Sequence, residues 1–138
     1  MITLSLKEIK FDEIREKWFS YELSDGTTLK LKPILIKVID EGEDEQGNPM
    51  LCLQATNVVG ISSSESINVE NFKEPKKDIK ITPLNDNWNE YKLKYETRNE
   101  MILKLKPVIT QIDRTGKLDP KGLPIYAIQS QQLFKLEK

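Results

Sequence analysis

Apolar and polar residues alternate along several segments of this chain, with the period of two that is typical of β-strands. The pattern predicts strands at residues 18–23, 28–39, 50–61, 101–112 and 125–136, which contain the strand-favouring residues Val, Ile, Tyr and Phe. Stretches rich in Gly, Pro and Asp punctuate them. The chain is therefore predicted to be all-β, with a minor helix at most.

Local signals refine the first part of this pattern. A short strand is expected at residues 9–11, followed by a single helical turn at 12–17, because Asp12 is suited to cap a helix. The corresponding segment of the second half contains Pro83, so we expect a loop there. Asp25-Gly26 predicts a tight two-residue hairpin turn, since glycine readily adopts the positive φ that both positions require.

Pro33 and Pro107 lie inside two of the predicted strands. Through residues 29–33 leucines alternate with lysines, whereas the apolar residues of 34–38 take the parity that the lysines had. A strand exchanges its two faces only if it slips by one residue or bends. We therefore predict a bulge or corner at each proline, where one long strand serves two sheets of a small barrel.

The sequence also indicates an internal duplication. The five residues 29–33, Leu-Lys-Leu-Lys-Pro, return at 103–107, an offset of 74 (103 − 29). Upstream the offset is 70 (88 − 18), and after the next loop it is 75 (124 − 49). Collinear matches on both sides favour duplication over chance. Identical upstream pairs are Ile9/Ile79, Lys10/Lys80, Trp18/Trp88, Tyr21/Tyr91 and Leu23/Leu93.

The predicted architecture is two tandem copies of a small barrel-like, curled antiparallel sheet, related by a pseudo-twofold axis. The first repeat covers residues 1–73, the linker 74–77 and the second repeat 78–138. Residues 67–72 are apolar enough to form a closing strand of the first repeat. A unit of this size buries only about 60 % of its unfolded surface, so we expect the two copies to pack on each other.

Composition excludes several kinds of protein. No apolar run approaches the roughly 20 residues that span a bilayer, and the first residues lack the features of a signal peptide. We therefore expect no membrane association and a cytoplasmic location. Cys52 is the only cysteine and lies in an apolar run, so it is expected to be a small buried side chain.

The sequence offers little catalytic chemistry. The chain contains no histidine, which removes the commonest general base and zinc ligand, and its six glycines do not form a phosphate-binding loop. The acidic residues from Asp40 to Glu45 lack the order of a calcium loop, and we interpret them as a solvated hairpin tip. We therefore predict no enzyme activity, catalytic residue, cofactor, metal site or small-molecule substrate.

Binding of single-stranded nucleic acid is one functional hypothesis. Lys92, Lys94, Lys104 and Lys106 are expected to share the outward face of a hairpin, where they would contact a phosphate backbone. Exposed aromatic side chains usually complete such a surface. Here Trp18, Trp88 and their paired tyrosines recur in both halves, which favours core or interface positions.

Interaction with protein is the preferred hypothesis, reached by elimination. The net charge of −1 is unevenly distributed: residues 1–69 hold 7 basic and 12 acidic residues (7 − 12 = −5), and 70–138 hold 14 and 10 (14 − 10 = +4). Such asymmetry is consistent with orientation of the two halves against each other, with head-to-tail contacts between molecules, and equally with unequal solvated surfaces. We predict a non-catalytic interaction or assembly module that acts through protein partners or self-association, with single-stranded nucleic-acid binding as the alternative.

Overall fold

The structure is a computed structural model that describes residues 7–63, 72–95 and 99–138. It contains eight β-strands, and no α-helix occurs in these described ranges, which confirms the all-β prediction. The strands are β1 (Lys7–Arg15), β2 (Phe19–Leu23), β3 (Thr28–Glu43), β4 (Pro49–Ser62), β5 (Ile81–Pro83), β6 (Asn89–Lys94), β7 (Met101–Leu118) and β8 (Pro124–Glu137).

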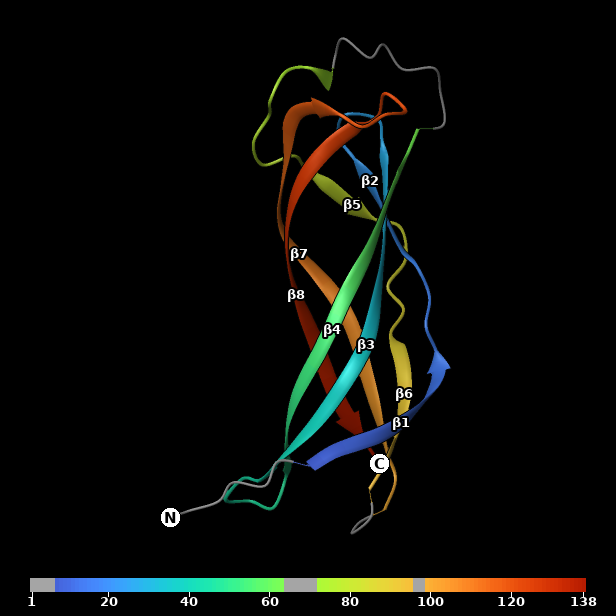
Figure 1. The fold of residues 1–138 in the computed structure, drawn as a ribbon, viewed down its shortest axis with the longest axis vertical. Helices are drawn as coiled ribbons and strands as arrows, with labels where there is room; N and C mark the ends of the chain where they lie inside the picture. Colours follow the sequence, from blue (N-terminus) through green and yellow to red (C-terminus); the bar gives the residue numbers. More distant parts are fainter. Residues whose placement is uncertain (1–6, 64–71, 96–98) are drawn as a thin grey trace.

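The strands form one antiparallel sheet in the order β5-β2-β3-β1-β6-β7-β8. Strands β2 and β1 pair with different parts of one edge of β3, and β4 pairs with its opposite edge. The long hairpins β3–β4 and β7–β8 run along the length of the molecule (Figure 1). Strand β1 joins them, because its residues 7–9 pair with β3 and its residues 10–15 pair with β6. The two halves of the chain are therefore hydrogen-bonded into a single sheet.

The segment 76–83 makes a similar connection in the opposite direction. Lys76 forms an antiparallel bridge with Arg114, and the Ile79 N–H donates a hydrogen bond to the Ile112 carbonyl at 2.8 Å. The chain then continues as β5, in which Ile81 pairs with Leu23 of β2. Each half thus contributes one segment that contacts its own long hairpin and then crosses to the short strand of the other half.

Two separate hydrophobic cores result, and each contains residues from both halves. The first core consists of Ile9, Leu35, Val38, Tyr91, Leu93, Leu103 and Leu105. The second core consists of Phe19, Tyr21, Leu23, Leu29, Leu31, Ile79 and Ile112. The leucines of both Leu-Lys-Leu-Lys-Pro segments are fully buried, whereas their lysines are not. The alternation in these segments therefore places leucine inward and lysine outward, as the pattern predicts.

In β3 and β7 the inward-facing residues change from odd-numbered to even-numbered positions a few residues after each proline, not at the proline itself. Pro33 is fully buried in regular register with Asn57, and the bulge falls between Leu35 and Lys37. On the edge of β3 opposite β4, strand partners are described only for residues 28–31 and 38–40. This gap explains why a residue without an N–H is tolerated, and the bulge lets Leu35 and Val38 both point inward.

Three local predictions were wrong. Residues 12–15 continue β1 instead of forming a helical turn, because pairing with β6 satisfies their backbone. The predicted loop at Pro83 is the end of β5, where an edge position needs no N–H from proline. In the hairpin turn after β2, residues 24–27 lie between the two strands and only Gly26 has positive φ (87°), with the Leu23 N–H donating to the Thr27 carbonyl at 2.9 Å.

Irregular features of the two long hairpins recur at the sequence offsets. The bulge at 35/37 on β3 corresponds to one at 109/111 on β7, an offset of 74 (109 − 35). Gly42 and Gly116, also 74 apart, both have positive φ. Gly47 and Gly122 close the two hairpin tips with φ of 80° and 84°. At these three pairs of positions the backbone conformation is therefore alike.

The connection between the halves is partly described. Residues 74–77, the predicted linker, lie against β7, where the Arg114 guanidinium donates to the Glu74 carbonyl at 3.0 Å. The predicted strand at 67–72 lies almost entirely outside the described residues. Among the described residues, no helix is long and apolar enough to cross a membrane.

Candidate functional site

The main candidate binding surface is formed by the outer strands of the two long hairpins, β4 and β8. In the described part of the chain β4 pairs only with β3, and β8 pairs only with β7, so each presents a free edge 14 residues long. Exposed edges normally carry lysine, proline or other features that prevent pairing with another chain. β4 contains no charged residue, and its one proline is the first residue. Its edge therefore lacks this protection.

Apolar side chains are exposed along both outer strands. Val58 on β4 is 42 % exposed, and Leu133, at the corresponding position of β8 (133 − 58 = 75), is 47 % exposed. Corresponding residues Val59 and Phe134 are also exposed, as are Met50 and Ile125 near the starts of the strands. Three pairs of positions 75 residues apart thus combine an open edge with apolar surface.

The two outer strands approach each other at their centres. The Gln132 side-chain amide donates to Asn57 Oδ1 at 2.9 Å, and Asn57 Nδ2 donates to Ser130 Oγ at 3.3 Å. Asn57 and Gln132 pair with Pro33 and Pro107 respectively, so each lies opposite the proline of its own hairpin. The two strands contact each other through these side chains at their centres. The ends of each strand are therefore more accessible to a binding partner.

The prediction of a buried Cys52 was wrong. It was expected to be buried, but it is exposed on β4. Its neighbours Leu51 and Leu53 are partly buried and pack on the first core, so Cys52 has the opposite, outward parity. The apolar run around Cys52 therefore covers the core with only alternate residues.

The four lysines of the nucleic-acid hypothesis lie on the outward face of β6 and β7, opposite the buried odd-numbered residues. Each forms an ion pair with at least one carboxylate, which balances much of the positive charge on this face. The pairs are Lys92–Glu100 at 2.8 Å, Lys94–Asp12 at 2.8 Å, Lys104–Glu137 at 3.1 Å with Glu90 at 3.6 Å, and Lys106–Asp86 at 2.9 Å.

The sequence favours core or interface positions for the repeated aromatic residues, and Tyr21 and Tyr91 are buried in the two cores. The tryptophans, in contrast, lie outside both cores. Trp18 is 41 % exposed because it precedes the inward-facing Phe19, and the Lys32 ammonium lies 6.0 Å from its ring centroid. Trp88 is half-buried, with the ammonium groups of Lys106 and Lys135 at 4.6 and 4.8 Å. Lysine thus covers part of each ring face through a cation–π contact.

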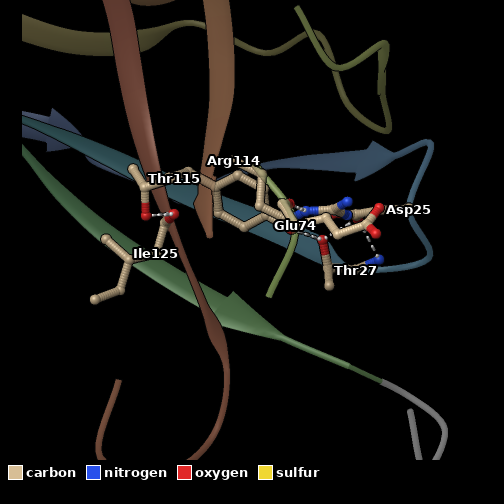
Figure 2. A network of polar contacts seen from close by, with 7 residues as sticks. Asp25, Thr27, Glu74, Arg114, Thr115 and Ile125 are labelled. Atoms are coloured by element: carbon tan, nitrogen blue, oxygen red, sulfur yellow. Dashed lines mark hydrogen bonds and ion pairs between the residues drawn. The ribbon is translucent and has the colours of Figure 1, made fainter. Parts of the chain in front are cut away.

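A buried polar network joins the halves near the second core (Figure 2). Arg114 of β7 is 9 % exposed, and its guanidinium lies 3.2 Å from Asp25 Oδ2 in the β2–β3 turn. The Tyr126 hydroxyl donates to the same carboxylate at 2.5 Å, and Thr27 Oγ1 donates to Asp25 Oδ1 at 2.7 Å. The phenol and Thr27 hydroxyl are also 2.9 Å apart. The network therefore joins the β2–β3 turn to strands β7 and β8 through buried hydrogen bonds and an ion pair.

The environment of Asp25 stabilises its carboxylate. Burial raises the pKa of Asp25, but hydrogen bonds from Tyr126, Thr27 and Arg114 together outweigh burial and hold the pKa below its ordinary value. Burial, and donation of its hydroxyl proton to Asp25, raise the pKa of Tyr126. The aspartate is therefore ionised and the tyrosine neutral at physiological pH.

The acidic residues 40–45 lie at the end of the β3–β4 hairpin: Asp40 to Glu43 are the last residues of β3, and Asp44 and Glu45 begin the exposed tip. Asp44 Oδ1 accepts hydrogen bonds from the N–H groups of Gln46 and Asn48 at 2.9 and 2.8 Å, and the Asn48 bond is the main cause of the lowered pKa of Asp44. Asp119 makes the same two contacts in the β7–β8 tip. Within the described residues, no group of three or more His, Cys, Asp or Glu is arranged to hold a metal ion.

Sequence reasoning missed both the free edges and the buried network. Absence of charge over residues 49–62 was visible in the sequence, but which strands lie at the edge depends on pairing between distant segments. Asp25 and Arg114 are 89 residues apart, and no local pattern connects them. No protein-family model, curated protein or solved structure matches the chain. Function is therefore inferred from these surfaces alone.

Proposed function

We propose that this protein is a non-catalytic interaction or assembly module that binds a protein partner, or a second copy of itself, through the free edges of β4 and β8. Addition of a strand to an exposed sheet edge is a common mode of recognition, in which backbone hydrogen bonds supply affinity and alternate side chains supply specificity. The observation that carries the proposal is the uncharged 14-residue edge of β4, with Met50, Val58 and Val59 exposed along it.

The proposal includes the duplicated architecture predicted from the sequence. We infer two copies of one unit, each a long hairpin with a short strand, that exchange their first segments around a pseudo-twofold axis and together resemble a small barrel. Support comes from the recurring bulges and positive-φ glycines and from the two cores of equivalent composition. Two copies supply two edges, which makes the module bivalent.

Substitutions at Cys52 test the use of the β4 edge. Lysine at an outward edge position opposes strand addition, so Cys52→Lys is expected to abolish self-association, while Cys52→Ser, which keeps the edge uncharged, retains it. Ala127→Lys and Ala127→Ser form the matching pair on β8 (127 − 52 = 75). Sedimentation velocity over a wide range of concentration measures the effect.

The controls separate this proposal from nucleic-acid binding. If the lysine and serine variants sediment alike, the edges are not the binding surface. Should single-stranded RNA or DNA bind the wild-type protein with steep salt dependence, and Lys104→Glu with Lys106→Glu abolish that binding, the lysine face of β6 and β7 is the functional surface instead. Circular dichroism confirms that each variant keeps its strand content.

A further inference from the structure

The molecule is electrically polarised along its length. The β3–β4 tip lies at one end of the molecule and the β7–β8 tip at the other (Figure 1). Residues 40–48 contain five carboxylates and no basic residue, a local charge of −5, and residues 41–48 are all exposed. Glu100 and Lys138 line a 410 Å³ hollow with Asn48 and offset each other. A second hollow beside Asp40 is lined by Lys7, Glu8 and Lys10 and by Lys94, which pairs with Asp12, so these neighbours add one positive charge (2 − 1 = +1) and leave −4 (−5 + 1) at this end. One end is therefore strongly acidic.

The opposite end carries an excess of lysine. Residues 115–123 of the β7–β8 tip and residues 73–78 beside them contain five lysines and three acidic residues (5 − 3 = +2). The two segments are held together by reciprocal backbone hydrogen bonds between Lys76 and Arg114 at 2.8 and 2.9 Å. Pro75 also lies against Gly116, where an added Cβ would approach its ring to 3.1 Å. The two lysine-bearing segments thus lie side by side.

Each charged end has an exposed apolar residue at an equivalent place. Met50 follows the acidic tip on β4, and Ile125 follows the basic tip on β8 (125 − 50 = 75); they are 43 % and 42 % exposed. The adjoining parts of both strands, residues 49–57 and 124–132, contain no charged residue. Opposite charges guide two such surfaces together, and apolar contact then stabilises them.

From this arrangement we infer that the occupant of the edges is a second copy of this chain, bound head to tail: the acidic β3–β4 tip of one molecule contacts the lysine-bearing end of the next. This inference rests on the proposed function and specifies its partner. A heterologous contact of this kind leaves one acidic and one basic end free, so it extends into chains of molecules unless the rotation closes a ring. The net charge of −1 opposes such growth only weakly.

Charge reversal at each end tests the inference. Glu41→Lys with Glu43→Lys and Glu45→Lys changes the charge of residues 40–48 from −5 to +1 (−5 + 6 = +1), which gives a protein with two basic ends. Lys117→Glu with Lys121→Glu changes the charge of the other end from +2 to −2 (2 − 4 = −2), which gives a protein with two acidic ends. Each variant alone is expected to be monomeric at concentrations where the wild-type protein associates. An equimolar mixture of the two variants is expected to associate again, because the acidic tip of one variant meets the basic end of the other. The single chain that carries all five substitutions has one basic and one acidic end and is expected to associate as well. Sedimentation velocity at low ionic strength measures each case.

Salt dependence and the Cys52 variants complete the test. Association of the wild-type protein is expected to weaken steeply as salt shortens the Debye length below about 10 Å. If the charge-reversed variants associate as well as wild type, or their mixture stays monomeric, the head-to-tail inference is overturned. In that outcome, loss of association in Cys52→Lys but not Cys52→Ser still supports edge binding. A wild-type protein that is monomeric at every concentration contradicts the inference. In that case the proposed function still stands if the wild-type protein and Cys52→Ser bind a different protein and Cys52→Lys does not.

Discussion

Arg114→Met is expected to lower the free energy of unfolding by about 3 kcal/mol, at the low end of the range for breaking a buried ion pair by removing one partner. The substitution leaves the Asp25 carboxylate buried without its counter-charge, although Thr27 and Tyr126 still donate hydrogen bonds. It also removes the bond to the Glu74 carbonyl that fixes the connecting segment to β7. Urea denaturation at neutral pH measures the loss.

A second substitution separates the charge from the packing. Adding Asp25→Asn to Arg114→Met removes the uncompensated charge, so the double variant is expected to be no less stable than Arg114→Met alone. Greater destabilisation of the double variant would show that the hydrogen bonds to Asp25, rather than its pairing with Arg114, supply the stability.

The pH dependence of stability follows from the lowered pKa of Asp25. Because the folded-state pKa lies below the unfolded value of about 3.9, the carboxylate stabilises the fold above that value and loses its effect as the pH falls through the folded-state pKa. Wild-type protein is expected to lose stability over this acidic window more steeply than Arg114→Met. Parallel slopes for the two proteins would contradict the assigned role of the ion pair.

Leu29→Ala and Leu103→Ala are each expected to cost about 2–5 kcal/mol, the usual range for a leucine truncated in a packed core. Both side chains have no exposed surface, and they occupy equivalent places in the second and first cores. If the halves are equivalent, the two losses are similar in size. Thermal and urea unfolding of both variants measure them.

Val59→Ala provides the matched control, since Val59 is exposed where it pairs with the buried Leu31. Its loss is expected to stay within about 0.5 kcal/mol, as for other surface substitutions. Strongly unequal costs at Leu29 and Leu103 would mean that one core dominates stability, and would argue against two equivalent units.

The strands could be predicted from the sequence because the alternation of apolar and polar residues indicates which face of each strand is buried. Leu29, Leu31, Leu103 and Leu105 define the inward parity of β3 and β7, and all four are buried. The bulges were predicted near Pro33 and Pro107 but lie after Leu35 and Ile109. Their position depends on where the neighbouring strands end, which the local pattern does not contain.

Predictions failed where a distant strand determined the outcome. Asp12 is a good helix cap in isolation, yet it pairs with Lys92 of β6 and forms an ion pair with Lys94. Trp18 and Trp88 recur in both halves as core residues do, but their parity places them outside. The edges of β4 and β8 became recognisable only from the strand order, because a strand lies at an edge when only one of its two sides is paired with another strand.

Amide hydrogen exchange at low and high protein concentration tests most directly whether the outer strands bind a second copy of the chain. Exchange is expected to slow with concentration in residues 49–57 and 124–132 and in the two hairpin tips, and to stay unchanged in the buried strands β2 and β6. Exchange that is independent of concentration along both outer strands would contradict self-association through these edges.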